Sequence, residues 1–250
     1  MKMEGNTILI TGGATGIGLA LTESLLKLGN EVIICGRRED RLIEVQNKHP
    51  GLHIRVCDVS DEDSRIELFK WVTENFKDLN VLINNAGIQR AIDLKEGIKG
   101  LEGENEIKIN LEATIYLSAL FIQFLESKEE SAIVNVSSGL AITPLAAVPI
   151  YCASKAGVHT YTKCLRSQLS DTNIRVFEVL PPLVISELNM DYRKKVGTTN
   201  TGVKADKCAA YIVDGLKNDK FEIENHALDN LKTATMEDVD KLFEKMNGQW

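Results

Sequence analysis

Residues 11–18 read TGGATGIG and lie between an apolar run, TILI (7–10), and a helix-like stretch that begins near Gly16. In that setting Gly12 permits a tight turn, and Gly18 lets the helix pack closely on the strand. Gly16 lets the backbone approach a pyrophosphate, for which the helix N-terminus supplies amide donors and partial positive charge. A glycine-rich turn alone is a weak signal, but its place between a strand and a helix is the context that dinucleotide binding requires.

Further along the chain, short apolar runs alternate with longer segments of helical periodicity. Buried strands are expected at 31–35, 52–56, 80–84, 132–136, 174–180 and 221–224. Helices are expected at 16–28, 39–48, 58–76, 104–126, 150–170 and 206–216. Continuous apolar strands that alternate with helices indicate a parallel sheet covered on both faces. The pattern therefore predicts an α/β fold, a single doubly wound domain over residues 1–250 with about seven strands.

Size, charge and cysteine content exclude several classes of protein. The chain has 250 residues, of which 44% are hydrophobic, and this is enough for one sizeable core. A net charge of −7 argues against binding to nucleic acid or to an anionic membrane. The opening MKMEGNTILI reads as neither a signal peptide nor a membrane span. The five cysteines show no CxxC or metal-ligand spacing, so free thiols, a cytoplasmic location and no metal site are expected.

Four further motifs accompany the glycine-rich turn. They are NNAG (84–87), KINLEA with Asn110, NVSS, and YCASK (151–155). Together with TGGATGIG, and in this order over nearly the whole chain, they resemble the short-chain dehydrogenase/reductase family. The spacing to YCASK favours Ser138 over Ser137, which strand alternation would point to the opposite face. The resemblance implies a Rossmann-like domain with a seven-stranded parallel sheet and a catalytic tetrad of Asn110, Ser138, Tyr151 and Lys155.

The chemistry of the family explains why these residue types are needed. Reducing a ketone by hydride transfer builds negative charge on the carbonyl oxygen, and Tyr151 would donate the proton that neutralises it. Because a free tyrosine has a pKa of about 10, the charge of Lys155, one helical turn away, would stabilise its anion. In the family this lysine also binds the nicotinamide ribose. Ser138 would align the substrate oxygen, and the backbone of Asn110 would anchor a water that links the lysine to solvent.

The resemblance also implies which residues hold a dinucleotide. Asn84, Ala86 and Gly87 belong to a motif that lines the adenine-ribose side and stabilises the sheet. Asp58 would contact the adenine edge, although a carboxylate that starts a helix is an alternative for it. The expected cofactor contacts are Gly12, Thr15, Gly16, Ile17, Gly18, Arg37, Arg38, Asp58, Val59, Asn84, Ala86, Gly87, Tyr151, Lys155, Pro181 and Ser186.

Cofactor choice is encoded at the end of the second expected strand, in CGRR (35–38). Family members that prefer NAD carry an acidic residue there for the ribose 2′-hydroxyl, whereas this chain has Gly36. Arg37 and Arg38 follow, and arginine can bind a 2′-phosphate through several donors. NADP(H) is therefore the expected cofactor, with NAD as an alternative if the arginines are merely solvated at the strand end.

The segment after the sixth expected strand departs from the family pattern. Many members read Pro-Gly there, followed by a threonine that holds the nicotinamide carboxamide, but this chain has Pro181-Pro182 and then Ser186. A second proline stiffens the turn and removes an amide donor. The Pro-Pro run and the FEKMN-like tail resemble a bacterial subset that includes oxidoreductases encoded near lipoteichoic-acid D-alanylation genes.

Two functions follow from the resemblance. The first is an NADP(H)-dependent oxidoreductase acting on a carbonyl or secondary alcohol; the alternative is a non-catalytic dinucleotide-binding regulator. Residues 187–203 are expected to form a mobile lid over a small-molecule substrate, and the basic cluster 193–195 would favour an anionic substrate unless it is simply solvated. Apolar positions on segments 104–126 and 150–170 occupy more than one stripe, which predicts a homodimer or homotetramer.

Overall fold

The strand order confirms the predicted doubly wound fold. The computed structural model describes residues 1–224 and 236–248, and within them a seven-stranded sheet has the order β3-β2-β1-β4-β5-β6-β9. All of its pairings are parallel. The strands of this sheet are β1 (Thr7–Thr11), β2 (Glu31–Gly36), β3 (His53–Val56), β4 (Leu79–Asn84), β5 (Ser131–Val136), β6 (Ile174–Leu180) and β9 (Glu222–Glu224).

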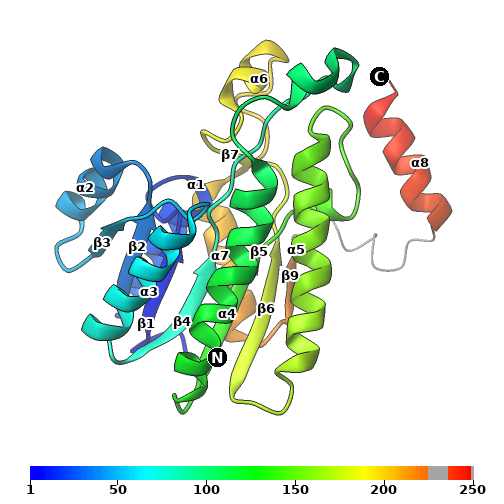
Figure 1. Cartoon of the computed structure of the whole chain (residues 1–250). Helices are drawn as coiled ribbons and strands as arrows, with labels where there is room; N and C mark the ends of the chain where they lie inside the picture. The colour runs from blue at the N-terminus through cyan, green and yellow to red at the C-terminus, as the bar shows by residue number, and fades with distance from the viewer. Residues whose placement is uncertain (225–235, 249–250) are drawn as a thin grey trace.

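Helices cover both faces of the sheet because the strands are apolar on both sides. In β1, Ile8 and Ile10 join the core under one helical layer, whereas Leu9 joins the core under the other. Figure 1 shows α3, α4 and α5 in front of the sheet, and α1 and α7 behind it. The six covering helices are α1 (Gly16–Lys27), α2 (Glu39–Lys48), α3 (Glu62–Asn75), α4 (Ala113–Glu126), α5 (Pro149–Gln168) and α7 (Ala205–Lys217).

The predicted helix over 104–126 differs from expectation at its start. Residues Ile107–Glu112 form one π-helical turn (η2), and the regular helix α4 begins only at Ala113. A π turn inserts one extra residue into a helix and is frequent at functional sites. It contains Asn110, the first of the expected catalytic residues.

Short elements surround the carboxyl ends of the strands. The segment expected to be a lid holds a helix between two short paired strands rather than an irregular loop. A C-terminal helix follows residues 225–235, which lie outside the described part of the chain. These elements are the 3₁₀ helices η1 (Leu94–Leu101) and η3 (Gly139–Ala141), β7 (Val184–Ile185), α6 (Met190–Lys195), β8 (Val203–Lys204) and α8 (Met236–Asn247).

The sheet topology determines where a ligand can bind. The chain builds outward from β1 in both directions, so the crossover helices on either side of β1 and β4 lie on opposite faces. In such sheets a crevice opens at the carboxyl ends of the two central strands. No helix among the described residues is long and apolar enough to cross a membrane.

Candidate active site

A cavity of about 930 Å³ opens at the carboxyl ends of the strands. Its walls come from the turns after β1, β2, β3, β4 and β6 and from the first turns of α5. The expected cofactor contacts that line it are Gly12, Thr15, Gly16, Ile17, Gly18, Arg37, Arg38, Asp58, Val59, Ala86, Gly87, Tyr151, Lys155, Pro181 and Ser186. The sequence motifs therefore converge on one cavity.

The glycine-rich turn leaves room for an anion at the start of α1. Gly12 has φ +65°, a conformation that favours glycine, and a Cβ on Gly18 would lie 2.2 Å from the Gly12 carbonyl oxygen. Thr15, the residue before α1, makes no side-chain capping bond to the helix. The amide groups of the first helical turn are thus not used by a capping side chain, and this arrangement fits a pyrophosphate at the helix N-terminus.

Ion pairs gather at the end of β2. Arg37 pairs with Glu104, and Arg38 lies 3.0 Å from a carboxylate oxygen of Glu187. Arg41 lies 3.2 Å from the other oxygen of Glu187. All five residues line the cavity, and the two acids come from distant segments of the chain. The sequence motif predicted two of these arginines but neither acid, because only the folded chain brings them together.

The NNAG motif needs a correction at its first residue. Asn84 does not line the cavity: it is buried in the sheet, where its Nδ2 donates to Ser118 Oγ at 3.1 Å and to Asn135 Oδ1 at 2.9 Å. The cavity is lined instead by Asn85, whose Nδ2 donates to the Thr11 carbonyl oxygen at 2.9 Å. Successive strand residues point to opposite sides, so Asn84 braces the sheet from inside and Asn85 faces the cavity.

Asp58 lies at the cavity and does not start α3, because the carboxylate that caps this helix is that of Asp61. It lines the cavity on the side of β3, as expected for a residue near the adenine. Its Oδ1 also accepts hydrogen bonds from the backbone N–H of Ser60 at 2.9 Å and from the Ser60 hydroxyl at 2.7 Å. The carboxylate therefore organises the turn that leads into α3 while facing the cavity.

Tyr151 and Lys155 lie one helical turn apart on α5, and both line the cavity. Lys155 Nζ lies 5.8 Å from the centre of the Tyr151 ring and donates a hydrogen bond to the Val136 carbonyl oxygen at 2.8 Å. Burial raises the pKa of Tyr151 to about 12, and a hydrogen bond with Ser138 partly opposes this rise. Burial lowers the pKa of Lys155 to about 8. The site therefore holds a neutral phenol beside a buried ammonium at neutral pH.

The two adjacent serines differ in their contacts. Ser138 Oγ accepts the N–H of Leu140 at 3.1 Å and contacts Tyr151. Ser137 Oγ donates instead to Glu178 Oε1 at 2.5 Å, and His159 Nδ1 lies 2.9 Å from Glu178 Oε2. The structure thus brings Ser138 to the tyrosine, while Ser137 is tied to a fully buried carboxylate of β6 that sequence motifs did not indicate.

Asn110 lies behind the cavity wall rather than in it. Its side chain holds the segment after NNAG: Oδ1 accepts the N–H of Ile88 at 2.8 Å, and Nδ2 donates to the Ile88 carbonyl oxygen at 2.9 Å. Nδ2 also donates to Ser154 Oγ on α5 at 3.0 Å. Asn110 therefore joins the π turn, the loop after β4 and the helix that carries Tyr151.

Comparison with known proteins agrees with both the sequence motifs and the fold. The sequence pattern of the short chain dehydrogenase family matches residues 6–197, more than half of the chain. The chain belongs to the short-chain dehydrogenase family. It is 49% identical over 251 aligned residues to the uncharacterized oxidoreductase DltE of Bacillus subtilis (strain 168), with 100% of this chain and 99% of the relative covered. This relative confirms the bacterial subset that the Pro-Pro run indicated, and the family establishes the protein as an oxidoreductase.

Solved members of the short-chain dehydrogenase family share the fold at low sequence identity. A member from Burkholderia phymatum, solved in complex with NAD, has a TM-score of 0.84 at 19% identity, and 96% of each chain is covered. A short-chain dehydrogenase from Burkholderia cenocepacia, solved in complex with NADP, has a TM-score of 0.83 at 24% identity, with 98% of this chain and 99% of that chain covered.

The basic cluster 193–195 of this short-chain dehydrogenase is divided, because Arg193 is buried and bonded to the backbone whereas Lys195 lines the cavity. Arg193 is only 4% exposed, and its guanidinium donates to the carbonyl oxygens of Val184 at 2.9 Å and of Thr201 at 2.7 Å. It thereby fixes α6 to β7 and to the chain just before β8. Lys195 does line the cavity, and Asn189 Nδ2 reaches Gln89 Oε1 across it at 3.3 Å.

Within residues 1–224 and 236–248, no group of three His, Cys, Asp or Glu side chains is placed to hold a metal ion. Tyr151 and Lys155, which line the cavity, can move protons there, and the hydroxyl of Ser138 contacts Tyr151. Of the two adjacent serines, Ser137 lines the cavity and Ser138 does not. The arrangement of Tyr151 and Ser138 suits proton transfer to an oxygen that lies between them.

Proposed function

We propose that this enzyme transfers a hydride between NADP(H) and a carbonyl or secondary alcohol, with Tyr151 as the acid or base. The observation that carries the proposal is the contact of Tyr151 with Ser138 at a cavity wall that also holds Lys155. A bound nicotinamide would supply or accept the hydride. A screen of ketones, aldehydes and secondary alcohols, with NADPH oxidation or NADP reduction as the readout, tests it. Tight NADPH binding without turnover of any compound would favour the regulator instead.

Each residue of the tetrad would have a different role. Tyr151, whose pKa of about 12 keeps it protonated, holds the proton at its hydroxyl until charge develops on the substrate oxygen. Lys155 is charged below its pKa of about 8 and stabilises the phenolate left behind. Ser138 donates a hydrogen bond to the same oxygen, and Asn110 positions α5 and the loop after β4. The catalytic roles of Ser138, Tyr151 and Lys155 thus follow from their chemistry and placement.

NADP(H) is proposed over NAD(H) on the basis of charge at the end of β2. Arg37, Arg38 and Arg41 line the cavity there, and Gly36 supplies no carboxylate to repel a 2′-phosphate. Glu104 and Glu187 partly neutralise these arginines. The affinity for NADPH should therefore exceed the affinity for NADH, but by less than three unpaired arginines would produce. The Burkholderia structures, bound to NADP in one case and NAD in the other, support a nicotinamide cofactor of either kind.

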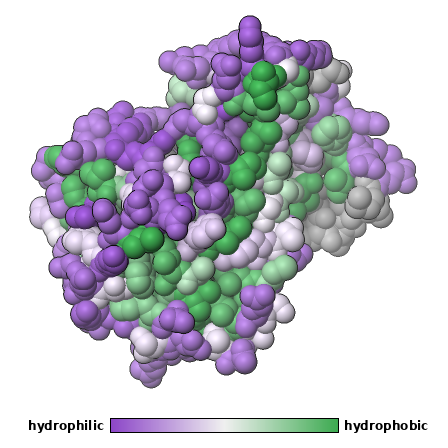
Figure 2. All heavy atoms as spheres, viewed as in Figure 1, coloured by the Kyte–Doolittle hydropathy of each residue, from purple (hydrophilic) through white to green (hydrophobic). Residues whose placement is uncertain are grey.

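We further propose that residues 1–250 act as one domain in a cytoplasmic homodimer or homotetramer. Figure 2 shows hydrophobic side chains running over the face that α4 occupies in Figure 1. Tyr116 on α4 and Ile107 just before it are exposed, while Leu117 and Phe121 are buried against the sheet. An exposed apolar face of this kind is covered when two copies pair. Light scattering that gives the monomer mass of 27.7 kDa for fully active protein would refute the assembly.

A further inference from the structure

The loop between η3 and α5, residues 142–148, lies beside Tyr151. Its last residues, Ala147 and Val148, belong to a buried apolar cluster with Tyr151, and Leu145 and Tyr192 pack against that cluster. Tyr192 comes from α6, in the segment expected to form a lid, and it lines the cavity. The position of this loop therefore affects both the proposed proton donor and the lid.

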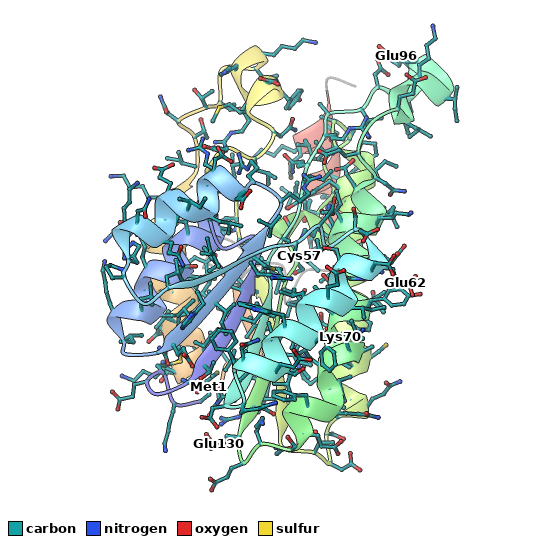
Figure 3. All side chains as sticks on the ribbon, turned by 60° about the vertical axis from the view of Figure 1, so that its left-hand side comes forward. Met1, Cys57, Glu62, Lys70, Glu96 and Glu130 are labelled. Carbon is teal, nitrogen blue, oxygen red and sulfur yellow. The ribbon has the colours of Figure 1, made fainter. Side chains whose placement is uncertain are left out.

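Helix α8 reaches the same end of the molecule. Figure 1 shows α8 beside the upper part of α5, the part that begins at Pro149. In Figure 3 the pale red α8 lies just below η1, where Glu96 is labelled, while Glu130 lies at the opposite end. Because Glu130 directly precedes β5, it marks the end of the parallel sheet at which the strands begin. Helix α8 is therefore at the carboxyl end of the sheet, where the cavity opens.

Asn247 joins α8 to this loop through both polar atoms of its side-chain amide. Its Oδ1 accepts the N–H of Ala146 at 2.6 Å, and its Nδ2 donates to the Pro144 carbonyl oxygen at 3.1 Å. The same Nδ2 donates to the Phe243 carbonyl oxygen in the preceding turn of α8, at 2.8 Å. A flipped amide would place its oxygen against two carbonyl oxygens, so the three bonds fit one orientation only. The contact ties residues 144–146 to α8.

Two other asparagines at helix ends show that this contact is not a routine feature of a helix terminus. Nδ2 of Asn75 at the end of α3 and Nδ2 of Asn218 after α7 each donate to the carbonyl oxygen four residues earlier, at 2.8 Å. Both residues are exposed, and within residues 1–224 and 236–248 their side-chain bonds stay in their own helices. Asn247 makes the same local bond, but it is only 7% exposed and also binds a second segment.

Among residues 237–248, Asn247 has the most buried side chain of α8. Val239 and Leu242 are half-buried, whereas Phe243 and Met246 are 38% and 39% exposed. A helix that buries so little apolar surface gains little free energy from packing. The hydrogen bonds of Asn247 therefore carry a large share of the attachment of α8 to the loop.

We propose that Asn247 is a positioning residue for the substrate, because it holds the loop that packs with Tyr151 and Tyr192. The inference rests on the proposed hydride-transfer function and assigns α8 a part in it. Without the amide contact, the loop would have to be ordered when a substrate binds, and this cost lowers substrate affinity. Turnover of the bound substrate should change little, because α5 itself carries Tyr151. Dinucleotide binding should not change, because residues 142–148 include none of the expected dinucleotide contacts.

The test compares full-length Asn247→Ala with the wild type, and Asn218→Ala is the matched control. The substrate is the ketone or aldehyde with the highest kcat/KM in the NADPH screen. In Asn247→Ala its KM should rise by about five- to tenfold, in keeping with the loss of two hydrogen bonds. The values of kcat and of NADPH affinity should stay within about twofold of the wild type. Hydrogen–deuterium exchange of the free protein should become faster over residues 144–148. Asn218→Ala should match the wild type in every measurement.

An unchanged KM in Asn247→Ala, or equal losses of substrate and NADPH affinity, would overturn the positioning role. A fall in kcat at constant KM would place the effect in the chemical step and would overturn it as well. Asn247→Asp keeps the acceptor for the Ala146 N–H but sets a carboxylate against two carbonyl oxygens, so its KM should rise at least as much. A wild-type KM in Asn247→Asp would overturn the two-atom contact. If no carbonyl compound were turned over, the proposed function would fail and this role with it, whereas turnover with an unchanged KM would overturn this role alone.

Discussion

At the catalytic end of the cavity Tyr151 and Lys155 are 7% and 4% exposed, whereas at the nucleotide end the side chains of Arg37 and Arg38 are 43% and 54% exposed. The catalytic groups are buried on α5 and held by Val136 of β5 and by Ser138, the residue before η3. The arginines pair with acids on two other surface segments, η1–η2 and the chain after β7. One end is thus held by packing, and the other by exchangeable ion pairs.

This difference has a physical cause and a consequence for function. A buried charge is costly, so it persists only where its geometry is strongly determined, and a change there has a large effect. An exposed ion pair contributes little and is screened by salt, so it can be rearranged at small cost. The chemistry of the enzyme should therefore tolerate almost no substitution, while cofactor preference should shift gradually. The following changes test that contrast.

The largest effect is expected from removal of the Tyr151 hydroxyl. Tyr151→Phe should lower kcat by about 10²–10⁴-fold, because proton transfer loses its donor. NADPH affinity should stay close to the wild-type value, since the arginine end is untouched. Steady-state kinetics and fluorescence titration on the same preparation check both parts. Near-normal kcat in this variant would mean that another group delivers the proton.

Replacement of Lys155 should separate stability from activity. Its pKa of about 8 in the folded protein lies below the usual 10.5, so the buried ammonium destabilises the fold at pH 7. Lys155→Met should abolish turnover but raise the free energy of unfolding, by about 3 kcal/mol for the relieved charge less about 1 kcal/mol for the lost bond to Val136. Urea denaturation at pH 7 measures it, with the exposed Lys163→Met on the same helix as the control.

The pH dependence of that gain gives an internal check. Between pH 8 and 10.5 the unfolded wild-type chain binds more protons at this lysine than the folded chain does, so wild-type stability should rise with pH across this window. The advantage of Lys155→Met should therefore be full below pH 8 and smaller at pH 9.5. An advantage that does not change with pH would show that the gain comes from packing rather than from the buried charge.

An intermediate effect is expected at the arginine end. Arg38→Ala removes a guanidinium that contacts both Glu187 and Thr15 Oγ1, the latter at 3.4 Å. NADPH affinity should fall by about tenfold, in keeping with one charge-assisted contact, while NADH affinity should hardly change. Comparative titrations with both cofactors measure this, and Lys207→Ala on the exposed surface of α7 controls for net charge. Equal losses for the two cofactors would rule out a contact with the 2′-phosphate.

The same contrast explains what could be predicted from sequence. Strand and helix positions follow from local periodicity, so α2 was predicted at its observed bounds, Glu39–Lys48. Most motif residues also converge on the cavity, because they lie in turns after strands or, for Tyr151 and Lys155, in the first turns of α5. Asn84 was misplaced because one step along a strand reverses the direction of a side chain. Arg193 could not be distinguished from a surface cation, since its partners are backbone carbonyl groups.

Long-range pairs were the main features that local patterns could not reveal. Glu104 and Glu187 lie far from the CGRR motif in sequence, and no spacing rule connects them to Arg37 or Arg38. Glu178 is an ordinary strand residue until the fold brings His159 and Ser137 to it. These contacts depend on how the segments return to the carboxyl edge of the sheet, which periodicity alone does not determine.

The smallest expected effect concerns Glu187, and it tests most directly whether the exchangeable ion pairs adjust cofactor preference. Its two carboxylate oxygens lie 3.0 Å from Arg38 and 3.2 Å from Arg41, so a 2′-phosphate would compete with it for the same donors. Glu187→Gln removes the competing charge and keeps the shape of the side chain. NADPH affinity should rise by about two- to fivefold at low salt, NADH affinity should not change, and the gain should shrink as salt increases. Glu44→Gln, which removes another partner of Arg41 on the exposed side of α2, is the matched control. A decrease in NADPH affinity in Glu187→Gln would show that this acid positions the arginines for the phosphate instead of competing with it.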